Sequence, residues 1–308
     1  MKSARAAGVL MAIGTAFAWS GAGAFAKLIA AGGVSQVTVV CYRAFFAAVA
    51  VWIFLLWRNG ACFFRCTKIE LAQYAALGVF TVLFNMTGYM MSCVYLSVPQ
   101  VLMVSYTYPI ITMAGSALIN GERPSVLQVL SGFLVLFGLY VGFGMGAVDF
   151  CDISLVGVAW AMISVVGLCG NALLSRKISS KSDPLKQLFY AQLIGAVALT
   201  VIRSATVGWG DVANFTPRLF LYLQYPSVVS SLIGYGLLFS SLKYISAPLA
   251  SMICTMEIVF AAALTTLIIH EVPPQNELIG SAVIAFAVIF SILSDRSEKR
   301  ENVDKIEP

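Results

Sequence analysis

The sequence predicts an all-α polytopic membrane protein of ten transmembrane helices, arranged as two inverted five-helix repeats. Three observations predict this fold class. The 308 residues are 60% hydrophobic and 11% charged, with a mean hydropathy of +0.90, whereas soluble chains carry about 25% charged residues. Motifs of the first half recur in the second half at one spacing, and lysine and arginine fall mainly on one set of loops. The net charge of +5 therefore reflects membrane orientation, and we expect no nucleic-acid partner.

Short motifs in the first half recur in the second half without a change of register. Tyr95–Pro99 (YLSVP) recurs as Tyr244–Pro248 (YISAP), and Glu122 recurs as Glu271, in each case 149 residues later (99 to 248, 122 to 271). This pattern predicts two helical bundles descended from one ancestral half. The predicted division is a first repeat over 1–148, a second repeat over 149–294 and a charged cytoplasmic tail over 295–308.

Ten apolar stretches follow one another with short loops between them. Each is long enough to cross a hydrocarbon layer of ~30 Å. We expect the spans near 8–30, 35–57, 70–93, 97–119, 126–146, 155–174, 185–206, 219–242, 248–269 and 276–294. The eighth is the least sharply bounded, because Gly210, Pro217 and Pro226 blur its start.

Local signals support individual spans. Basic residues before the first span imitate a secretory signal peptide, but the repeat counterpart at 157–177 lies mid-chain, so we expect no cleavage. Pro109 is expected to break the fourth span, because proline removes a backbone donor. Gly138 and Gly142 allow close helix packing in the fifth span. The second half diverges at Ile258, which occupies the position of the proline.

The placement of lysine and arginine orients the spans. Of the 19 such residues, Lys27, Arg203 and Arg218 fall on one side, Arg43 lies within a span, and the remainder fall on the other side. Because short cytoplasmic loops are enriched in these residues, we expect both termini in the cytoplasm. Five spans per repeat is an odd number, so the second repeat enters the membrane in the opposite orientation.

Catalytic and cofactor signatures are missing from the sequence. The single histidine, His270, lies at the edge of the ninth span, and the chain has no Walker loop, no HExxH and no Gly-x-Ser-x-Gly sequence. The seven cysteines are interpreted as small apolar packing residues. We therefore expect a protein that is not an enzyme and that holds neither a metal nor a cofactor.

Two charged residues are expected deep inside the membrane, where ionised side chains are costly and indicate functional sites. Arg43 lies about eight residues into the second span and Glu257 about nine residues into the ninth, at similar depths. Arg43 serves as the counter-ion of a bound carboxylate or as the partner of Glu257, and Glu257 serves as a proton acceptor. The structural alternative is an ion pair that orients two helices, or an arginine that extends to the interface.

Polar and aromatic residues within the spans form a second group of candidates. Uncharged polar groups in hydrocarbon must find partners within the bundle or in a wet cavity, and tyrosine and tryptophan suit a ligand that is partly apolar. The candidates of the two halves are Trp19, Asn85, Tyr89 and Tyr106, then Asn171 and Tyr235. For any one of them the alternative is a structural hydrogen bond between helices. Glu122 and Glu271, at the ends of the fourth and ninth spans, are interpreted as braces of the following turn.

The order of these motifs resembles the EamA-type family of the drug/metabolite transporter superfamily. The motifs are Arg43, Pro99, Pro109, Glu122-Arg123 and Gly132, then Pro248, Glu257, Glu271 and Gly280. The resemblance implies a central cavity lined mainly by spans 1–4 and 6–9, with spans 5 and 10 at the periphery, and alternating access by rocking of the repeats. Two departures are Ile258, where the family commonly has a Glu-Pro pair, and Val272, where it often has arginine.

The resemblance implies a secondary transporter in the inner (plasma) membrane, with a small-molecule substrate. We expect an exporter of amino acids or related polar metabolites, with protons as the coupling ion through Glu257. A carrier of nucleotide sugars or organic phosphates is the alternative within the family, and phosphate sites usually gather several basic donors. A non-transporting receptor or assembly subunit is the alternative from another class. The sequence carries no prediction of the oligomeric state.

Overall fold

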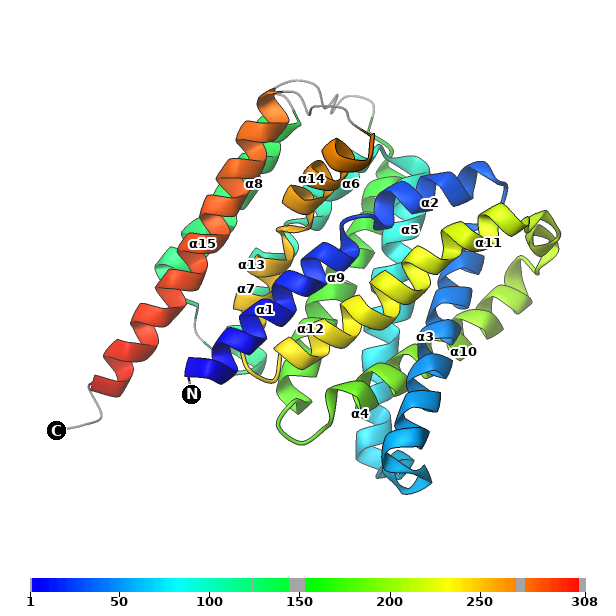
Figure 1. Cartoon of the computed structure of the whole chain (residues 1–308), viewed down its shortest axis with the longest axis horizontal. Coiled ribbons are helices and arrows are strands. Elements are labelled where there is room, and N and C mark those ends of the chain that lie inside the picture. The colour runs from blue at the N-terminus through cyan, green and yellow to red at the C-terminus, as the bar shows by residue number, and fades with distance from the viewer. Residues whose placement is uncertain (1, 123, 144–152, 270–274, 305–308) are drawn as a thin grey trace.

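The structure is a computed structural model that describes residues 2–122, 124–143, 153–269 and 275–304. Within these ranges it is all-helical and contains no strand (Figure 1). The first half contains α1 Lys2–Trp19, α2 Ala22–Ala31, α3 Gln36–Asn59, η1 Ala61–Phe64, α4 Lys68–Gly78, η2 Val79–Met86, α5 Thr87–Tyr95, α6 Val98–Ser105, α7 Tyr108–Ile119 and α8 Val126–Gly142. The second contains α9 Leu155–Ile178, α10 Pro184–Thr206, η3 Gly210–Asn214, α11 Pro217–Gln224, η4 Tyr225–Gly234, α12 Tyr235–Ser241, α13 Ala247–Cys254, α14 Glu257–Ile269 and α15 Gln275–Asp304.

Helices occupy all ten expected ranges. Among the described residues, seven are long and apolar enough to cross a membrane: Ser3–Ala31, Gln36–Asn59, Lys68–Tyr95, Gln100–Ile119, Leu155–Ile178, Pro184–Thr206 and Gln275–Asp295. Val126–Gly142 and Ala247–Ala263 are shorter apolar helices, and the helical run 217–241 covers the expected eighth span. The polytopic all-α class is confirmed, and the count of ten spans stays a prediction.

Capping side chains explain where several helices begin. Thr67, Ser97 and Ser125 each accept a hydrogen bond from the backbone N–H three residues on, and the side-chain oxygen of the Glu or Gln at that position accepts one from the N–H of the cap residue. Such reciprocal bonds satisfy backbone donors that a helix start leaves unpaired. Asp183 caps α10 in a related way, with proline as the first helical residue.

The first span is divided by a turn that the sequence analysis did not predict. A turn at Ser20–Gly21 separates α1 from α2. The backbone N–H of Gly21 donates to the Tyr225 hydroxyl at 3.0 Å. A Cβ at Gly21 would lie 2.6 Å from the Tyr225 ring, so the tyrosine fits only because this residue is glycine. The ring of Tyr225 therefore approaches the chain where the helix is interrupted.

The fourth and ninth spans are broken at equivalent positions. α6 ends at Ser105 and α7 begins at Tyr108, while α13 ends at Cys254 and α14 begins at Glu257, which are 149 positions later (105 to 254, 108 to 257). Proline follows the first break, as expected, but Ile258 follows the second. Proline is therefore not required for the break, which belongs to the packing that both repeats share.

Contacts between the two halves recur with the halves exchanged. Gly8 lies against Ile245, and a Cβ there would be 3.0 Å from its side chain. The exchanged pair, Gly157 and Leu96, is also in contact, with a Cβ at Gly157 2.6 Å from the leucine. Each glycine lies 149 positions from its counterpart (8 to 157), as does each apolar partner (96 to 245).

A second pair of contacts follows the same exchange. The Thr15 hydroxyl donates to the Gly234 carbonyl at 3.2 Å. At the exchanged positions (15 to 164, 85 to 234), the Asn85 side-chain amide donates to the Ser164 carbonyl at 3.4 Å. A twofold relation between the halves produces such paired contacts, so the repeat seen in the sequence is also a repeat of packing.

α8 and α15 run side by side along one flank of the molecule (Figure 1). Gly138 and Gly142 in α8 lie against Gly280 in α15, where a Cβ would come 2.4 Å from the Gly142 Cα. These contacts are the close packing expected for the fifth span. The position of α8 and α15 on one flank (Figure 1) agrees with the peripheral place that the resemblance implies for spans 5 and 10. α15 also continues to Asp304 as a helix, whereas the sequence analysis ended the span at 294 and began the tail at 295. Asp295 forms an ion pair with Arg5 at 2.8 Å.

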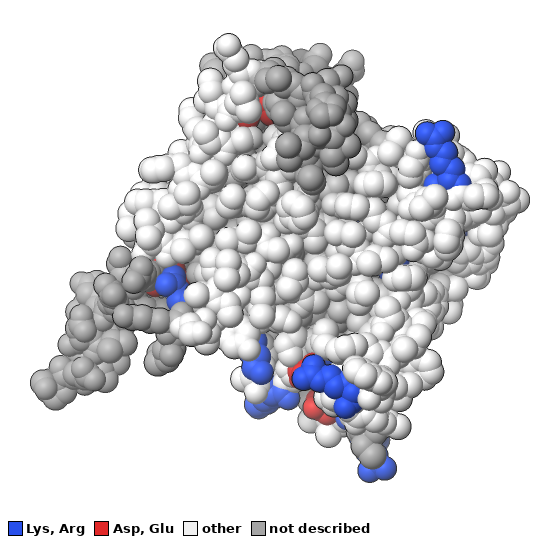
Figure 2. All heavy atoms as spheres, viewed as in Figure 1, with Lys and Arg blue, Asp and Glu red and all other residues white. Residues whose placement is uncertain are grey.

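Charged side chains gather toward the two ends of the molecule (Figure 2). On the face shown, a broad band without charge separates a basic and acidic cluster at the lower edge from isolated charges at the upper edge. α1 begins and α15 ends at that same lower edge (Figure 1). An uncharged belt between two charged rims is the surface that a lipid bilayer requires.

Candidate functional site

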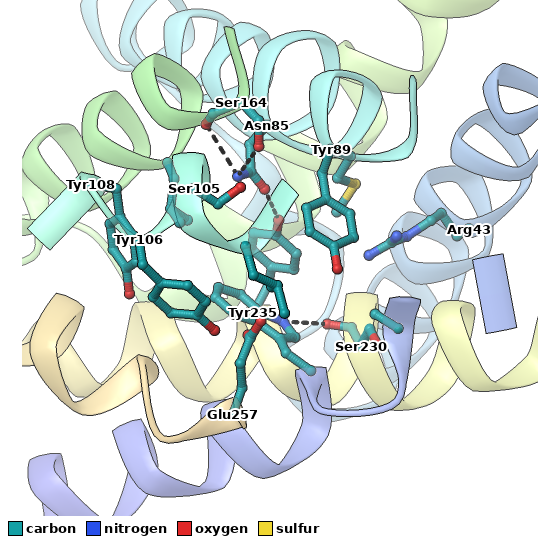
Figure 3. Close-up of a pocket in the computed structure, with 15 residues that line it drawn as sticks. Arg43, Asn85, Tyr89, Ser105, Tyr106, Tyr108, Ser164, Ser230, Tyr235 and Glu257 are labelled. Atoms are coloured by element: carbon teal, nitrogen blue, oxygen red, sulfur yellow. Dashed lines mark hydrogen bonds between the residues drawn. The ribbon is translucent and has the colours of Figure 1, made fainter. Parts of the chain in front are cut away.

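A pocket lies between the two halves and takes residues from both (Figure 3). Its cavity volume is about 70 Å³, which is smaller than that of a typical small-molecule site, so the pocket is narrow in this conformation. The lining residues are Trp19, Ala22, Arg43, Asn85, Met86, Tyr89, Leu102, Ser105, Tyr106, Tyr108, Ser164, Leu168, Ser230, Tyr235 and Glu257. The broken spans supply several of them, because Ser105, Tyr106, Tyr108 and Glu257 lie at or beside the two breaks.

Arg43 enters the pocket from α3 and is 4% exposed. Its Nε donates to the Ser231 hydroxyl at 2.6 Å, which fixes the guanidinium on one edge and leaves its outer nitrogens directed at the pocket (Figure 3). The Tyr89 hydroxyl points toward it in the same view. A buried guanidinium presents paired donors that match a carboxylate.

Glu257 enters the pocket from the start of α14, opposite Arg43 (Figure 3). Both residues lie in the described part of the chain, and no ion pair joins them there. The internal Arg43–Glu257 pair, one of the two alternatives for Arg43, is therefore not formed in this conformation. The Tyr106 hydroxyl points toward the glutamate. The pocket thus holds an acidic and a basic group on separate walls.

Hydrogen bonds hold the aromatic wall in place. The Tyr235 hydroxyl donates to the side-chain oxygen of Asn85, and the Trp19 indole N–H donates to the Ser230 carbonyl at 3.2 Å. The rings of Trp19 and Tyr235 lie 5.0 Å apart. The Tyr108 hydroxyl donates to the backbone of the second half. Because these hydrogen bonds occupy the polar atoms of Trp19, Tyr108 and Tyr235, these side chains present mainly the faces of their rings to a ligand.

All the candidate residues from the sequence analysis except Asn171 line this pocket. Asn171 is fully buried in α9, away from the lining. Sequence reasoning left out Ser105, Ser164 and Ser230 from its candidates. Tyr108, the counterpart of Glu257 (108 to 257), also lines the pocket.

Glu122 links the two halves at one end of the molecule, whereas the sequence predicted that it braces the turn that follows it. It accepts from the Arg176 guanidinium at 2.7 Å and from the Ser116 hydroxyl at 2.9 Å. Arg176 also donates to the Leu242 carbonyl at 2.8 Å. These bonds join the end of α7 in the first half to α9 and the α12–α13 turn in the second. Glu271 lies outside the described residues.

A second polar cluster ties the segment after α10 to the start of α3. Asp211 accepts from the Ser35 N–H at 2.9 Å, from the Thr38 hydroxyl at 2.5 Å and from the Arg203 guanidinium. Burial raises the pKa of Asp211, but the hydrogen bonds from Thr38 and Ser35 and the charge of Arg203 outweigh it, so the net pKa lies below the ordinary value. Arg203 also lies over the Trp209 ring, 4.9 Å from its centre.

Comparison with known proteins gives a family match, a curated relative and similar solved structures. The EamA-like transporter family model matches residues 6–143 and 155–293. A chloroplastic WAT1-related protein of Arabidopsis thaliana is 23% identical over 197 residues, 56% of this chain and 46% of that protein. This chain therefore spans less than half the length of that curated relative.

One solved crystal structure is similar over 95% of this chain and 98% of its own, with a TM-score of 0.77 and 17% identity. This likeness establishes the fold alone. The family match covers both repeats, with its interruption at the segment between α8 and α9. By that match, the chain belongs to the EamA-like transporter family.

Proposed function

We propose that this protein is a secondary transporter of small metabolites, with amino acids or related polar compounds as its substrates. The observation that carries the proposal is the pocket between the halves, where Arg43 and Glu257 stand on opposite walls with aromatic rings between them. A zwitterion with an organic side chain matches that arrangement. Its carboxylate binds Arg43, its ammonium group lies toward Glu257, and its side chain contacts Trp19 and Tyr235.

The chemistry of the pocket favours one negative group on the substrate. Arg43 is the single lysine or arginine among the described lining residues. A phosphate or pyrophosphate group normally binds several basic donors, so nucleotide sugars and organic phosphates are less well matched. Glu257 would also repel a second negative charge. Saturable movement of substrate across the membrane separates a transporter from the receptor alternative.

Alternating access follows from the paired contacts between the halves. If the two halves exchange conformations, the contacts of one half become those of the other, and the pocket opens to the opposite side. We propose inverted repeats for this reason, supported by the odd number of spans per half. Export from the cytoplasm across the inner membrane, with proton coupling through Glu257, completes the proposal, and no chemical conversion of the substrate is expected.

Both termini are proposed to be cytoplasmic. Basic residues gather at the edge where α1 begins and α15 ends (Figures 1 and 2), which agrees with the positive-inside rule. A reporter fused after Pro308 should be active only when cytoplasmic. Activity of the reporter on the outside would reverse the proposed orientation and leave the repeat architecture unaffected.

The direct test is uptake of labelled compounds by proteoliposomes that contain the purified protein. The panel contains zwitterionic amino acids, their amides without a carboxylate, dicarboxylic acids and a hexose phosphate. The proposal expects saturable uptake of the zwitterions and weaker uptake of the amides. If the hexose phosphate were taken up in preference to all the amino acids, organic phosphates rather than amino acids would be the substrate class. Folded protein that moves no member of the panel would contradict the proposal.

A further inference from the structure

Four fully buried polar side chains outside the pocket have atoms with no hydrogen-bond partner among the described residues; Ser291 in α15 is one, and the other three lie in η2 or in the helices that pack against it. The atoms of those three are the Thr81 hydroxyl, both polar atoms of the Asn171 amide and both of the Gln192 amide. All three residues are 0% exposed. A buried polar group without a partner costs about 1–3 kcal/mol, and nearly all such groups in native proteins are paired. Five such atoms in three residues therefore require an explanation.

The three residues lie where α9 and α10 each pack against η2. The Ser175 hydroxyl of α9 donates to Gln187 of α10 at 2.7 Å, near the turn that joins the two helices. Asn171 lies one turn after Gly167, where a Cβ would come 2.7 Å from the Phe80 carbonyl of η2. On the η2 side, a Cβ at Gly195 would touch Val82 at 2.6 Å. Thr81 is the residue before Val82, so it lies at the same junction.

The repeat register links these residues to the central pocket. A shift of 149 positions carries Gln192 to Arg43, Asn171 to Ala22, and Thr81 to Ser230 (43 to 192, 22 to 171, 81 to 230). Arg43, Ala22 and Ser230 all line the pocket. Each unpaired group therefore occupies a position whose counterpart in the opposite half faces the pocket.

We propose that Thr81, Asn171 and Gln192 form a second polar subsite, closed in this conformation, that lines the cavity when the two halves exchange conformations. The inference rests on the proposed transport function and extends it. In the exchanged state the polar atoms gain water or the transported molecule as partners. The subsite takes uncharged hydrogen-bonding groups, because its donors and acceptors are two amides and a hydroxyl.

The two faces of the cavity then differ in charge. One conformation presents the Arg43 guanidinium to the substrate, and the other presents the neutral Gln192 amide at the equivalent position. A carboxylate is held by a charge-assisted bond in the first state and by a weaker neutral bond in the second. The affinity for substrate is therefore higher in the conformation that presents Arg43 than in the conformation that presents Gln192.

Accessibility of matched cysteines tests the subsite without any knowledge of the substrate. Thr81→Cys and Ser230→Cys are conservative changes at exchanged positions, made in a background whose native cysteines are replaced. A membrane-impermeant methanethiosulfonate is applied to sealed vesicles of each orientation. We expect the two cysteines to react from opposite sides of the membrane. Reaction from the same side, or no reaction at position 81 while position 230 reacts, would overturn the inference.

Thermal stability provides a second test with a matched control in the same helix. Gln187 and Gln192 are both 0% exposed in α10, but Gln187 is hydrogen-bonded to Ser175, whereas Gln192 has no hydrogen-bond partner within the described part of the chain. Gln187→Leu should lower the Tm, whereas Gln192→Leu should leave it unchanged or raise it. An equal loss of Tm in both variants would show that Gln192 is already satisfied in this state.

The flux of the same variant separates the subsite from the proposed function. Gln192→Leu should slow the transport of a zwitterionic amino acid about tenfold while the ligand-induced rise in Tm is retained. Wild-type protein without flux, together with cysteines that react from opposite sides, would reject the transport proposal and retain the subsite. Normal flux in Gln192→Leu would reject the subsite alone.

Discussion

Arg43 and Glu257 are the residues on which the account of the pocket depends. Arg43 is held by Ser231, and Glu257 stands at the start of α14, where the ninth span is broken. Both were identified from the sequence because charge within an apolar span is unusual. That they share one pocket without forming an ion pair could not be predicted, because it depends on the relative placement of two helices from different halves.

The first prediction concerns Arg43. Arg43→Gln keeps a donor and removes the charge, so the KM for zwitterionic amino acids should rise about 10- to 100-fold, the value of a charged hydrogen bond. The KM for amide analogues without a carboxylate should change little. Arg218→Gln, on the exposed surface, serves as the control. An equal loss for both substrate classes would identify Arg43 as a structural residue.

The second prediction concerns Glu257. Glu257→Gln keeps the shape of the side chain but cannot take up a proton, so flux should lose its response to a pH gradient while ligand-induced thermal stabilisation persists. Glu277→Gln, outside the pocket, should retain the gradient response. Flux is measured with and without an imposed gradient. A variant that still follows the gradient would exclude Glu257 as the coupling group.

Asn171 shows where residue patterns mislead. It was chosen because a polar side chain within a span suggested a wet cavity, and it is instead buried at the junction of η2, α9 and α10. Ala22, its counterpart in the first half, lines the pocket. The sequence analysis recognised the polar group correctly, but of these two equivalent positions only Ala22 lines the pocket in this conformation.

At the scale of elements, the broken helices build the pocket. Hydropathy and the repeat predicted the ranges of the spans, and Pro109 predicted the break of the fourth. The break of the ninth has no proline and was not expected. The turn between α1 and α2 was also missed, because it depends on Tyr225 packing from a distant helix against Gly21. The ranges of the spans can be predicted from local sequence. Breaks that depend on packing against a neighbouring helix cannot, because they arise from tertiary contacts.

The third prediction concerns the Asp211 cluster, which joins η3 to the start of α3. The pKa of Asp211 lies below its ordinary value of 3.8, so the ionised form stabilises the fold above that pH, and the stabilisation is lost as the pH falls through the lowered pKa. Asp211→Asn leaves Arg203 without its buried partner. It should destabilise the protein by about 2–3 kcal/mol at pH 7.

The check is the Tm as a function of pH. The wild-type Tm should fall as the pH drops below about 4, and Asp211→Asn should flatten this part of the profile. Asp183→Ser, which keeps a capping oxygen at the start of α10, should retain the wild-type profile. Parallel profiles for wild type and Asp211→Asn would contradict the assigned role of the cluster.

At the scale of the whole molecule, the chain consists of two halves related by one register and by exchanged contacts. The sequence predicted the register, and the structure shows that packing follows it at Gly8 and Gly157. Residues of both halves line the pocket, and the counterparts of three of them, Thr81, Asn171 and Gln192, are buried without hydrogen-bond partners among the described residues. One conformation of a protein that alternates between two would have this asymmetry.

The most direct test of this account is trans-stimulation of flux in proteoliposomes. A single site that is exposed alternately returns faster when it is loaded, so amino acid on the trans side should accelerate the unidirectional flux of labelled amino acid from the cis side. Flux that saturates and is stimulated in this way would support the account. Flux that is unaffected by trans substrate, or that does not saturate, would indicate a channel and contradict it.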